Sequence, residues 1–522
     1  MGPAHRLIRF SPRDRRDLIA RGLRPRDARR QARLLRRPPP FPPLLRPCSI
    51  GDGIERLSRA ERDRLARLAR SADHAGRFSR FIPASGAATR LFHPLLQLDR
   101  ARKESRASAG EVLRQGGAPF SRDAFRFFSE LDRFALRSDL AKILKKIHQK
   151  NLPRLLAKQD LDPLLDALLG PKGLDLARRP KGLIPFHRIG PRSRTAFEEQ
   201  VVESSAFADK TRPVRVHFTV LPEHLAEYRR LGRQVSESLK RRSRGLAELK
   251  FSVQDASLDT LALDADGGWV RRSDGGLLFR PGGHGALLAN LEGTGGDLVF
   301  IKNIDNVPTP SHQAEGNLWR AALAGRLIEA QETSGRWIQA VRARNSPHGI
   351  IRQAENFIRV TLGSGVPRGL TLAQRRARVV RLLTRPWRVC GMVPNRGEPG
   401  GGPFWVTGGE GPFVQIVEAS QIPHSREALL GRATHFNPVD MVVGLRDFRG
   451  KPFRLSPYAD PSAAMVSRKH FEGQDILTLE HPGLWNGGMA HWNTIFVEIP
   501  ARVFHPVKTI NDLLRPGHRA NR

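Results

Sequence analysis

Hydrophobic residues recur with two different periods along this chain, and the change of period predicts how it is organised. Between residues 95 and 180 apolar residues recur every three or four positions, as on the buried face of a helix. The clearest such stripe, which we expect to be core, is Phe125, Phe128, Leu131, Phe134 and Ala135. From Lys181 onward short apolar runs alternate with helical patterns, which is typical of a mostly parallel sheet. The pattern predicts an α/β fold with a helical insertion.

Individual elements can be placed on this pattern. The capping box from Ser58 to Glu61 predicts a helix over about 58–72, and Arg77 to Pro83 is expected to be a strand. Pro222 is expected in the first turn of a helix that runs to about Leu239. The other predicted strands are 214–220, 249–253, 261–263, 298–301 and 494–499.

The chain is expected to hold one large domain behind a basic arm. Residues 1–74 form the arm and its helix, and the prolines between 38 and 43 predict an extended linker within it. The large domain spans 75–515, with the insertion at about 95–180 and a C-terminal part at about 385–515.

Composition narrows the class of protein. The 522 residues are 39% hydrophobic, which fits a globular chain, and no apolar run is long enough for a transmembrane helix. The N-terminus has no apolar segment of the kind that signals secretion. Cys48 and Cys390 are isolated, which fits a reducing cytoplasm rather than a disulfide framework.

The charge balance is strongly basic. Lys and Arg number 88 against 51 Asp and Glu, a formal net charge of +37. A polyanion partner is one explanation. Because the arginines are spread along the whole chain rather than gathered with aromatic residues, a general preference for arginine explains the charge better, and no specific nucleic-acid partner is expected.

Two motifs suggest a site for a nucleotide and a divalent cation. Arg280 to Gly285 is a glycine-rich turn whose backbone can approach a flat or anionic ligand closely. Asp305 follows the apolar strand 298–301, and the carboxyl ends of parallel strands are where α/β sheets bind ligands. A lone carboxylate is sufficient for Mg²⁺, which takes its other ligands from water and substrate phosphates.

Two further segments have phosphate-binding character. The loop 84–90 lies between a strand and a helix and ends in Thr89 and Arg90, a hydroxyl and a cationic fork suited to phosphate. Lys181 lies in a Pro-Lys-Gly-Leu sequence and is a mobile positive charge. The same four residues occur at 171–174, but the second copy precedes a more strand-like segment.

In this order the motifs resemble the UTP–sugar-1-phosphate uridylyltransferases, that is, the UDP-glucose and UDP-N-acetylhexosamine pyrophosphorylases. The matching segments are 84–91, 180–182, 251–254, 281–285, 303–306, 417–422 and 504–514. More narrowly, residues 280–285, 301–306, 397–406 and 484–493 resemble a bacterial family described as a domain of unknown function, DUF4301. The resemblance implies a nucleotidyltransferase fold of the GT-A-like, Rossmann-like kind.

The resemblance also implies roles for single residues. Asp305 would bind Mg²⁺, while Arg90, Lys181 and Lys508 would neutralise the phosphates of an NTP, UTP by preference, and of a sugar-1-phosphate. Asn303 and Glu418 would contact the sugar. The nucleotide would be held by Ser85, Gly86, Ala87, Ala88, Thr89, Gln254, Gly282, Gly283, His284 and Gly285. In-line attack of the sugar phosphate on the α-phosphorus would then release pyrophosphate.

The chain departs from that family in places. Residues 85–88 are Ser-Gly-Ala-Ala where the family has Gly-Gly-x-Gly, so either the backbone differs there or phosphate binds less closely, and Gln421 replaces a glutamate. Other interpretations therefore stay open. One is a glycosyltransferase with Asp264 and Asp266 on a metal, although Gly267 and Gly268 favour a hairpin turn at that point. The others are a polyanion-binding protein that uses arm 1–47 and a relative that binds nucleotide without turnover.

Overall fold

The computed structural model describes residues 10–190, 192–207, 211–242, 245–343, 346–397, 400–409, 411–437 and 439–519. By their internal contacts the residues form two compact units, each built from three separate segments. Unit 1 holds Met1–Phe81, Ser252–Ile301 and Trp319–Ala501, and unit 2 holds Ile82–Phe251, Lys302–Leu318 and Arg502–Arg522. The division expected at about residue 75 stays a prediction.

A mixed, mostly parallel sheet forms the centre of unit 1. Its strands, in spatial order, are β2 (Ser49–Ile50), β3 (Gly53–Glu55), β18 (Asn493–Glu498), β12 (Trp387–Met392), β15 (Asp440–Gly444), β11 (Leu298–Lys302) and β4 (Phe78–Pro83). β11 and β4 are parallel, with Phe300 opposite Arg80, and so are β12 and β18. β15 pairs antiparallel with β12. The predicted α/β class is confirmed.

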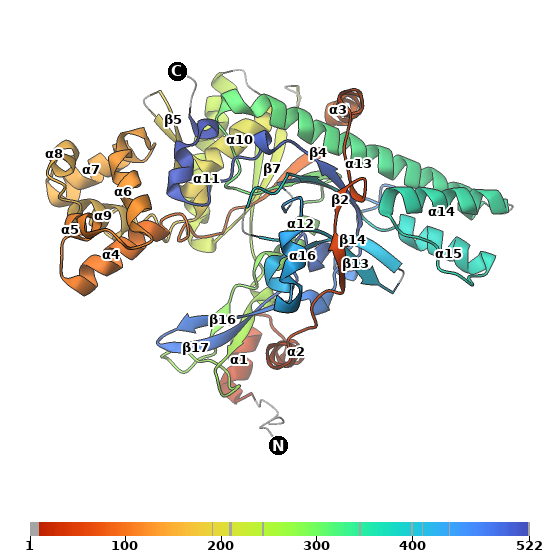
Figure 1. Cartoon of the computed structure of the whole chain (residues 1–522), viewed down its shortest axis with the longest axis horizontal. Helices are drawn as coiled ribbons and strands as arrows, with labels where there is room; N and C mark the ends of the chain where they lie inside the picture. The colour runs from red at the N-terminus through yellow and green to blue at the C-terminus, as the bar shows by residue number, and fades with distance from the viewer. Residues whose placement is uncertain are drawn as a thin grey trace. The chain divides into compact units, whose positions relative to one another are not determined.

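Helices flank this sheet (Figure 1). They are α3 (Arg59–His74), α12 (Leu288–Glu292), α13 (Gln313–Arg342), α14 (His348–Leu362) and α15 (Leu372–Leu383), while the short helix α16 (Glu427–Gly431) packs on a smaller sheet described below. The capping box predicted for α3 is present, because the Ser58 hydroxyl accepts from the Glu61 N–H and the Glu61 carboxylate accepts from the Ser58 N–H. α13 packs closely on α3, since a Cβ at Gly325 would lie 2.0 Å from the Leu65 carbonyl oxygen. No helix in the described residues is long and apolar enough to cross a membrane.

Two antiparallel sheets complete unit 1. Their orders are β10 (Phe279–Arg280), β9 (Thr260–Leu263), β17 (Gln474–Glu480), β16 (Met465–Phe471), and β1 (Leu44–Pro47), β13 (Gly402–Gly408), β14 (Gly411–Val417). The prediction that 261–263 is a strand is confirmed, but its place in the parallel sheet is wrong. β9 pairs antiparallel with β10 and β17. A four-residue apolar run carries no information on which strands it pairs with or in which direction.

The basic arm is packed from residue 10 to residue 36, whereas residues 37–43 hold no helix or strand and are mostly exposed, as the prolines predict. It forms α1 (Pro12–Ala20) and α2 (Pro25–Arg36). Leu18 and Leu35 are buried in one cluster with Leu261 and Trp269 of the four-stranded sheet and the turn beside it. The Gln31 carboxamide accepts from the Leu261 N–H at 2.9 Å. The arm therefore contributes to the core of unit 1 and is not a free basic extension.

Unit 2 joins a helical insertion to an α/β segment. The insertion is α4 (His93–Ser105), α5 (Ala109–Gln115), α6 (Ser121–Ser129), α7 (Arg137–His148), α8 (Leu152–Ala157) and α9 (Asp162–Leu169), which gather in one group in Figure 1. The α/β segment is β5 (Pro185–Ile189), β6 (Arg192–Thr195), α10 (Ala196–Phe207), β7 (Val214–Val220), α11 (Leu225–Arg241) and β8 (Ala247–Val253). The remaining predicted helices and strands lie within a few residues of these bounds.

The apolar stripe that begins on α6 was predicted with one error. Phe128, Leu131, Phe134 and Ala135 are buried as expected, but Phe125 is 59% exposed. Phe127, which the stripe omitted, is fully buried and contacts the rings of Phe128 and Phe134. Residues two apart on a helix point about 200° apart, so only one of Phe125 and Phe127 can face the core.

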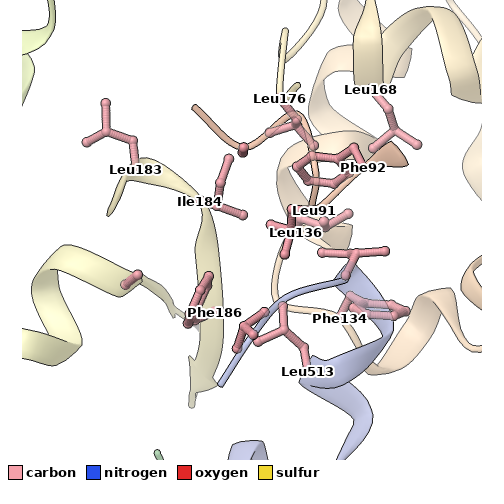
Figure 2. Close-up of a cluster of buried hydrophobic side chains, with 14 of the residues drawn as sticks. Leu91, Phe92, Phe134, Leu136, Leu168, Leu176, Leu183, Ile184, Phe186 and Leu513 are labelled. Atoms are coloured by element: carbon pink, nitrogen blue, oxygen red, sulfur yellow. The ribbon is translucent and has the colours of Figure 1, made fainter. Parts of the chain in front are cut away.

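A continuous apolar core joins the insertion to the rest of unit 2. Figure 2 shows Phe92 and Leu91, which follow loop 84–90, beside Leu136 of the insertion and Leu513 of the C-terminal segment. Phe186 of β5 and the nearby Ile184 enter the same cluster. Burial of this kind contributes about 25 cal/mol per Å² of apolar surface. It fixes loop 84–90, the segment before β5 and the C-terminal segment against one another.

Candidate active site

Two lysines converge on one carboxylate in unit 2. Lys181 Nζ lies 2.7 Å from Oδ2 of Asp305, and Lys508 Nζ lies 3.2 Å from the same oxygen. The Asp305 side chain is 8% exposed and that of Lys181 14%, whereas that of Lys508 is 56% exposed. With both lysines charged the cluster has a net charge of +1, so it attracts an anion.

Burial raises the pKa of Asp305, but the charges of Lys508 and Lys181 and the hydrogen bonds they donate outweigh burial. The pKa of Asp305 is therefore below its usual value, and the group is a carboxylate at neutral pH. Within the described residues no group of three or more His, Cys, Asp or Glu could hold a metal. A cation at Asp305 would thus take most of its ligands from substrate and water.

A buried glutamine holds the loop that carries Asp305 in place. β11 ends at Lys302, whose ammonium pairs with Glu203 of α10 inside the core. Gln200, on the same helix, donates from Nε2 to the carbonyl oxygens of Asn303 at 3.0 Å and Ile304 at 3.3 Å. Because α10 supplies these partners, the loop after β11 keeps one conformation.

Lys508 is positioned by its own turn. The Asp512 carboxylate accepts from the N–H groups of Lys508 and Thr509, both at 2.8 Å, in a capping box. The Val507 N–H donates to the Asp305 carbonyl at 3.0 Å. The main chain beside Lys508 is therefore fixed to the Asp305 loop, while the half-exposed lysine side chain is able to turn toward a ligand.

The segment that carries Lys181 runs along the loop 84–90. The Ala88 N–H donates to the Arg179 carbonyl, and the Lys181 N–H donates to the Gly86 carbonyl, both at 2.9 Å. The next residue, Gly182, leaves room for Tyr228, because a Cβ there would lie 2.3 Å from the tyrosine oxygen. The Tyr228 hydroxyl donates to the Ala84 carbonyl at 3.0 Å.

Loop 84–90 has features of an anion site, although its backbone conformation does not require glycine. No residue from Ser85 to Ala88 has a positive φ, so the two alanines are accommodated without strain, as the departure from Gly-Gly-x-Gly requires. In the described part of the chain no hydrogen bond is recorded for the N–H groups of Ser85, Gly86 and Ala87. Three consecutive N–H groups without a recorded partner are able to donate to a phosphate.

The two residues at the end of this loop behave differently. Thr89 donates its hydroxyl proton to the Ala177 carbonyl at 3.1 Å, so donation to a phosphate would require that bond to break. Arg90 is exposed, and no ion pair is recorded for it among the described residues. Of the two, Arg90 is the one available to a ligand.

The glycine-rich turn lies in unit 1 and is tightly packed. A Cβ at Gly285 would lie 2.1 Å from the Pro482 carbonyl oxygen, and one at Gly282 would lie 2.3 Å from that of Leu258. His284 stacks on Trp485 with 4.5 Å between ring centroids, and its Nδ1 accepts from the Leu484 N–H at 2.9 Å. Burial lowers the pKa of His284, so the ring is neutral. The glycines serve backbone packing as well as any ligand.

The other residues assigned by resemblance belong to both units, and in unit 1 Trp485 contacts both His284 and Glu418. Glu418, in unit 1, accepts from Asn437 at 3.1 Å and from Trp485 at 3.4 Å. Gln254, also in unit 1, donates to Asp259 at 3.4 Å. Asn303 belongs to unit 2, two residues before Asp305. Within unit 2 the structure therefore brings together Lys181, Asp305 and Lys508, with Asn303 and loop 84–90 adjoining them.

Gln421 has a local role that explains its amide. Its carboxamide oxygen accepts from the Glu418 N–H at 3.2 Å and from Asn486 at 3.4 Å. A glutamine that bridges two donors in this way is a turn-capping residue. The replacement of a glutamate by Gln421 therefore changes a hydrogen-bond partner of the Glu418 main chain and leaves the Glu418 side chain in place.

The competing metal motif is a turn, as its glycines indicated. The Asp264 carboxylate accepts from the Gly268 N–H at 2.8 Å, and Gly267 has a φ of +77°. Asp266 is exposed at the tip of this turn. The Asp264 carboxylate is occupied in closing the turn that follows β9, which leaves the glycosyltransferase interpretation without structural support.

Three positioning residues were not predicted from the sequence. They are Gln200, Tyr228 and Glu203. The signal for Gln200 and Glu203 was weak, because a polar residue inside a helix is expected to face solvent unless its whole helix is buried. α10 is such a helix, since Glu199, Gln200 and Glu203 are all fully buried, whereas Tyr228 lies on the buried face of α11.

Comparison with known proteins gives one family and several similar structures. A family model described as Domain of unknown function (DUF4301) matches residues 11–519. Among curated proteins none matches the chain.

Three solved structures illustrate the similarity. One is the uridine diphosphate N-acetylglucosamine pyrophosphorylase from Trypanosoma brucei in complex with inhibitor, at 13% identity, covering 97% of this chain and 79% of that one, with a TM-score of 0.48. The putative UDP-N-acetylglucosamine pyrophosphorylase from Entamoeba histolytica has 10% identity, coverage of 88% and 82%, and a TM-score of 0.42. The UDP-glucose pyrophosphorylase from Leishmania major has 10% identity, coverage of 97% and 79%, and a TM-score of 0.44.

Proposed function

This chain belongs to the DUF4301 family, and we propose that it is a nucleotidyltransferase that joins a nucleotidyl group from an NTP to a sugar-1-phosphate and releases pyrophosphate. UTP is the favoured NTP. The observation that carries the proposal is the meeting of Lys181 and Lys508 on one oxygen of Asp305. The two lysines come from distant segments of the chain, yet both reach a carboxylate whose loop is fixed by Gln200.

The charges fit two phosphorylated reactants. The sugar phosphate is already an anion, so the reaction needs no general base, and positioning and charge neutralisation carry catalysis. Lys181, whose main chain is bonded to loop 84–90, would hold the triphosphate together with the N–H groups of Ser85, Gly86 and Ala87. Lys508, which is more exposed, would turn toward the sugar phosphate. Arg90 would add a third positive group.

Asp305 fits Mg²⁺ as one carboxylate among substrate ligands. A bound Mg²⁺ would neutralise charge on the α-phosphate and on the incoming phosphate. In the free protein Lys181 and Lys508 already satisfy the charge of Asp305. When phosphates bind they compete for both ammonium groups and leave the carboxylate free for the cation. We therefore infer that metal and nucleotide bind together, each weakly alone.

Residues for the base and the sugar follow from the resemblance. Gln254 and Gly282 to Gly285, His284 included, would contact the base. Asn303 and Glu418 would accept hydrogen bonds from the sugar hydroxyls. Glu418 is supported by Asn437 and Trp485, which hold its carboxylate in one orientation.

The proposal is tested by a pyrophosphate-release screen on the full chain. UTP, ATP, CTP, GTP and dTTP are each combined with several sugar-1-phosphates, with Mg²⁺ or with chelator. Release above the no-sugar control for one pairing, abolished by chelator, is the expected result. Equilibrium binding of Mg-UTP is measured in parallel. If nucleotide binds but no pairing releases pyrophosphate, the chain is a nucleotide-binding relative without turnover and the proposal is wrong.

A further inference from the structure

Unit 2 contains a large cavity. None of the residues assigned above to the active site lines this cavity. Its volume is about 900 Å³, and it lies among α7, the β5–β6 hairpin, α10 and α11. Cavities that bind small molecules usually have volumes of about 300–1,000 Å³. Lys181, Asp305 and Lys508 do not line it, but Arg179 and Leu183, which flank Lys181, do. We call it the α11 cavity.

The lining combines an apolar floor with a basic rim. Six buried aliphatic residues form the floor: Leu136, Leu176, Leu183, Val202, Val235 and Leu239. Six basic and four acidic side chains also line the cavity, a net charge of +2. Such a surface complements a molecule that is apolar at one end and anionic at the other.

Some of the basic side chains already have partners and others do not. Arg179 pairs with Glu227 of α11, and Arg194 lies 3.6 Å from the buried Glu199. For Arg192, Arg241 and Arg242, which are exposed at the rim, no ion pair is recorded within the described residues. These three guanidinium groups are available to a carboxylate or phosphate.

We propose that the α11 cavity binds a small amphiphilic anion, an aliphatic or aromatic body with one carboxylate or phosphate, and that its occupancy controls Lys181. The body occupies the leucine and valine floor, and the anion meets Arg192, Arg241 and Arg242. Binding stands on the cavity alone. Only the control of Lys181 rests on the function proposed above.

The cavity and the active site share one segment of main chain. Residues 177–181 are tied to loop 84–90 by the Ala88-to-Arg179 and Lys181-to-Gly86 backbone bonds and by the Thr89 hydroxyl. The side chains of Arg179 and Leu183, at either end of Lys181, line the cavity. Figure 2 shows Leu183 and Ile184 leaving the segment in different directions, Ile184 toward the core.

A ligand in the cavity therefore acts on the segment that carries Lys181. An apolar body against Leu183 holds the short turn Lys181–Leu183 in place, while Arg179, two residues before Lys181, stays paired with Glu227. Coupling through such a shared element typically changes the affinity of the second site about 5- to 150-fold.

Binding is tested on the full chain with anilinonaphthalene sulfonate as the fluorescent probe. Decanoate and decyl phosphate should displace it, and comparing the two identifies the preferred anion, while decanol should displace it at least about tenfold less well. The double variant Arg241→Ala/Arg242→Ala and the cavity-narrowing Leu231→Trp should each weaken decanoate binding at least about tenfold. Arg233→Ala, an exposed position on α11 outside the lining, is the matched control, and circular dichroism confirms that each variant is folded.

Equal displacement by decanol and decanoate, or unchanged binding in folded Arg241→Ala/Arg242→Ala, would overturn the assignment of an anion site.

Control of Lys181 is tested by hydrogen exchange and by Mg-UTP binding with and without decanoate. Decanoate should slow amide exchange in residues 177–183 and change Mg-UTP affinity at least about fivefold. Slowed exchange without any turnover in the pyrophosphate screen would uphold the cavity and refute the proposed function. Turnover with unchanged exchange and unchanged Mg-UTP affinity would refute the coupling.

Discussion

Lys508 Nζ lies 3.2 Å from Oδ2 of Asp305, although 203 residues separate the two in sequence. Lys508 is more than half exposed, whereas Asp305 is buried and also accepts a hydrogen bond from Lys181 at 2.7 Å, so the Lys508 contact contributes less to stability than a fully buried pair does. The half-exposed ammonium group is accessible to a ligand.

Replacing Lys508 should therefore impair activity more than folding. Lys508→Met is expected to lower turnover about 10²–10³-fold, as the loss of one charge-stabilising donor does, with little change in the urea midpoint. Lys172→Met is the matched control, because Lys172 is an exposed lysine in the Pro-Lys-Gly-Leu copy at 171–174. Equal turnover in the two variants would remove Lys508 from the mechanism.

Gly86 in loop 84–90 and Gly182 beside the loop should respond differently to substitution by alanine. Gly182→Ala places a methyl group 2.3 Å from the Tyr228 oxygen, which must then give up its bond to Ala84. Overpacking of this kind costs about 1–3 kcal/mol and should also displace Lys181. Gly86→Ala meets no protein atom within 4 Å and needs no positive φ, so its urea midpoint should hardly change. Urea unfolding and turnover of the two variants test this, and a Gly182→Ala protein as stable and active as Gly86→Ala would contradict the packing described.

A buried histidine pair should make the protein less stable in acid. His187 Nε2 and His518 Nδ1 lie 3.0 Å apart in the interior. Burial, followed by the nearby His187 and His505, keeps the pKa of His518 well below 6.5. The unfolded chain binds a proton near pH 6.5 and the folded chain does not, so stability falls as pH decreases below 6.5 toward the folded pKa.

The measurement is the urea midpoint at pH 8 and at pH 5.5. The midpoint should be lower at pH 5.5, and His518→Gln should reduce the difference. His424→Gln is the control, because the His424 side chain is fully exposed. A difference between the two pH values that is the same in His518→Gln and the parent would show that this pair does not carry the effect.

The α6 phenylalanines give a direct stability test of the packing. Phe127→Ala removes a fully buried ring and should cost about 3–5 kcal/mol of unfolding free energy. Phe125→Ala changes an exposed ring and should cost less than about 0.5 kcal/mol. Denaturant unfolding of both variants decides between the stripe predicted from sequence, which includes Phe125, and the observed one.

That pair also shows how far the hydrophobic pattern can be taken. Phe125 and Phe128 satisfy helical spacing, but Phe127 and Leu131 satisfy it equally well, and only the position of the helix on the core decides between them. The same holds for strand 260–263, whose apolar run predicts a strand but not its antiparallel partners. The hydrophobic period and the helix caps depend on local sequence. The face that a helix buries and the partners that a strand pairs with depend on tertiary contacts.

The residues that we propose for phosphate and metal binding were more predictable than the residues that hold them in place. Lys181, Asp305 and Lys508 stand in short motifs with a chemical reason for each side chain, and the structure brings them together. Gln200 and Tyr228, which fix the loops around them, stand in no motif. Their role depends on a buried helix and on a glycine contact that exist only in the folded chain.

The central claim is that Asp305 serves phosphate chemistry together with Mg²⁺. The most direct measurement is Mg²⁺-dependent pyrophosphate release by the parent, by Asp305→Asn and by Asp266→Asn, whose carboxylate lies exposed on a turn. Release should be at least about 10²-fold lower in Asp305→Asn and unchanged in Asp266→Asn. Undiminished release by a folded Asp305→Asn protein would contradict the account.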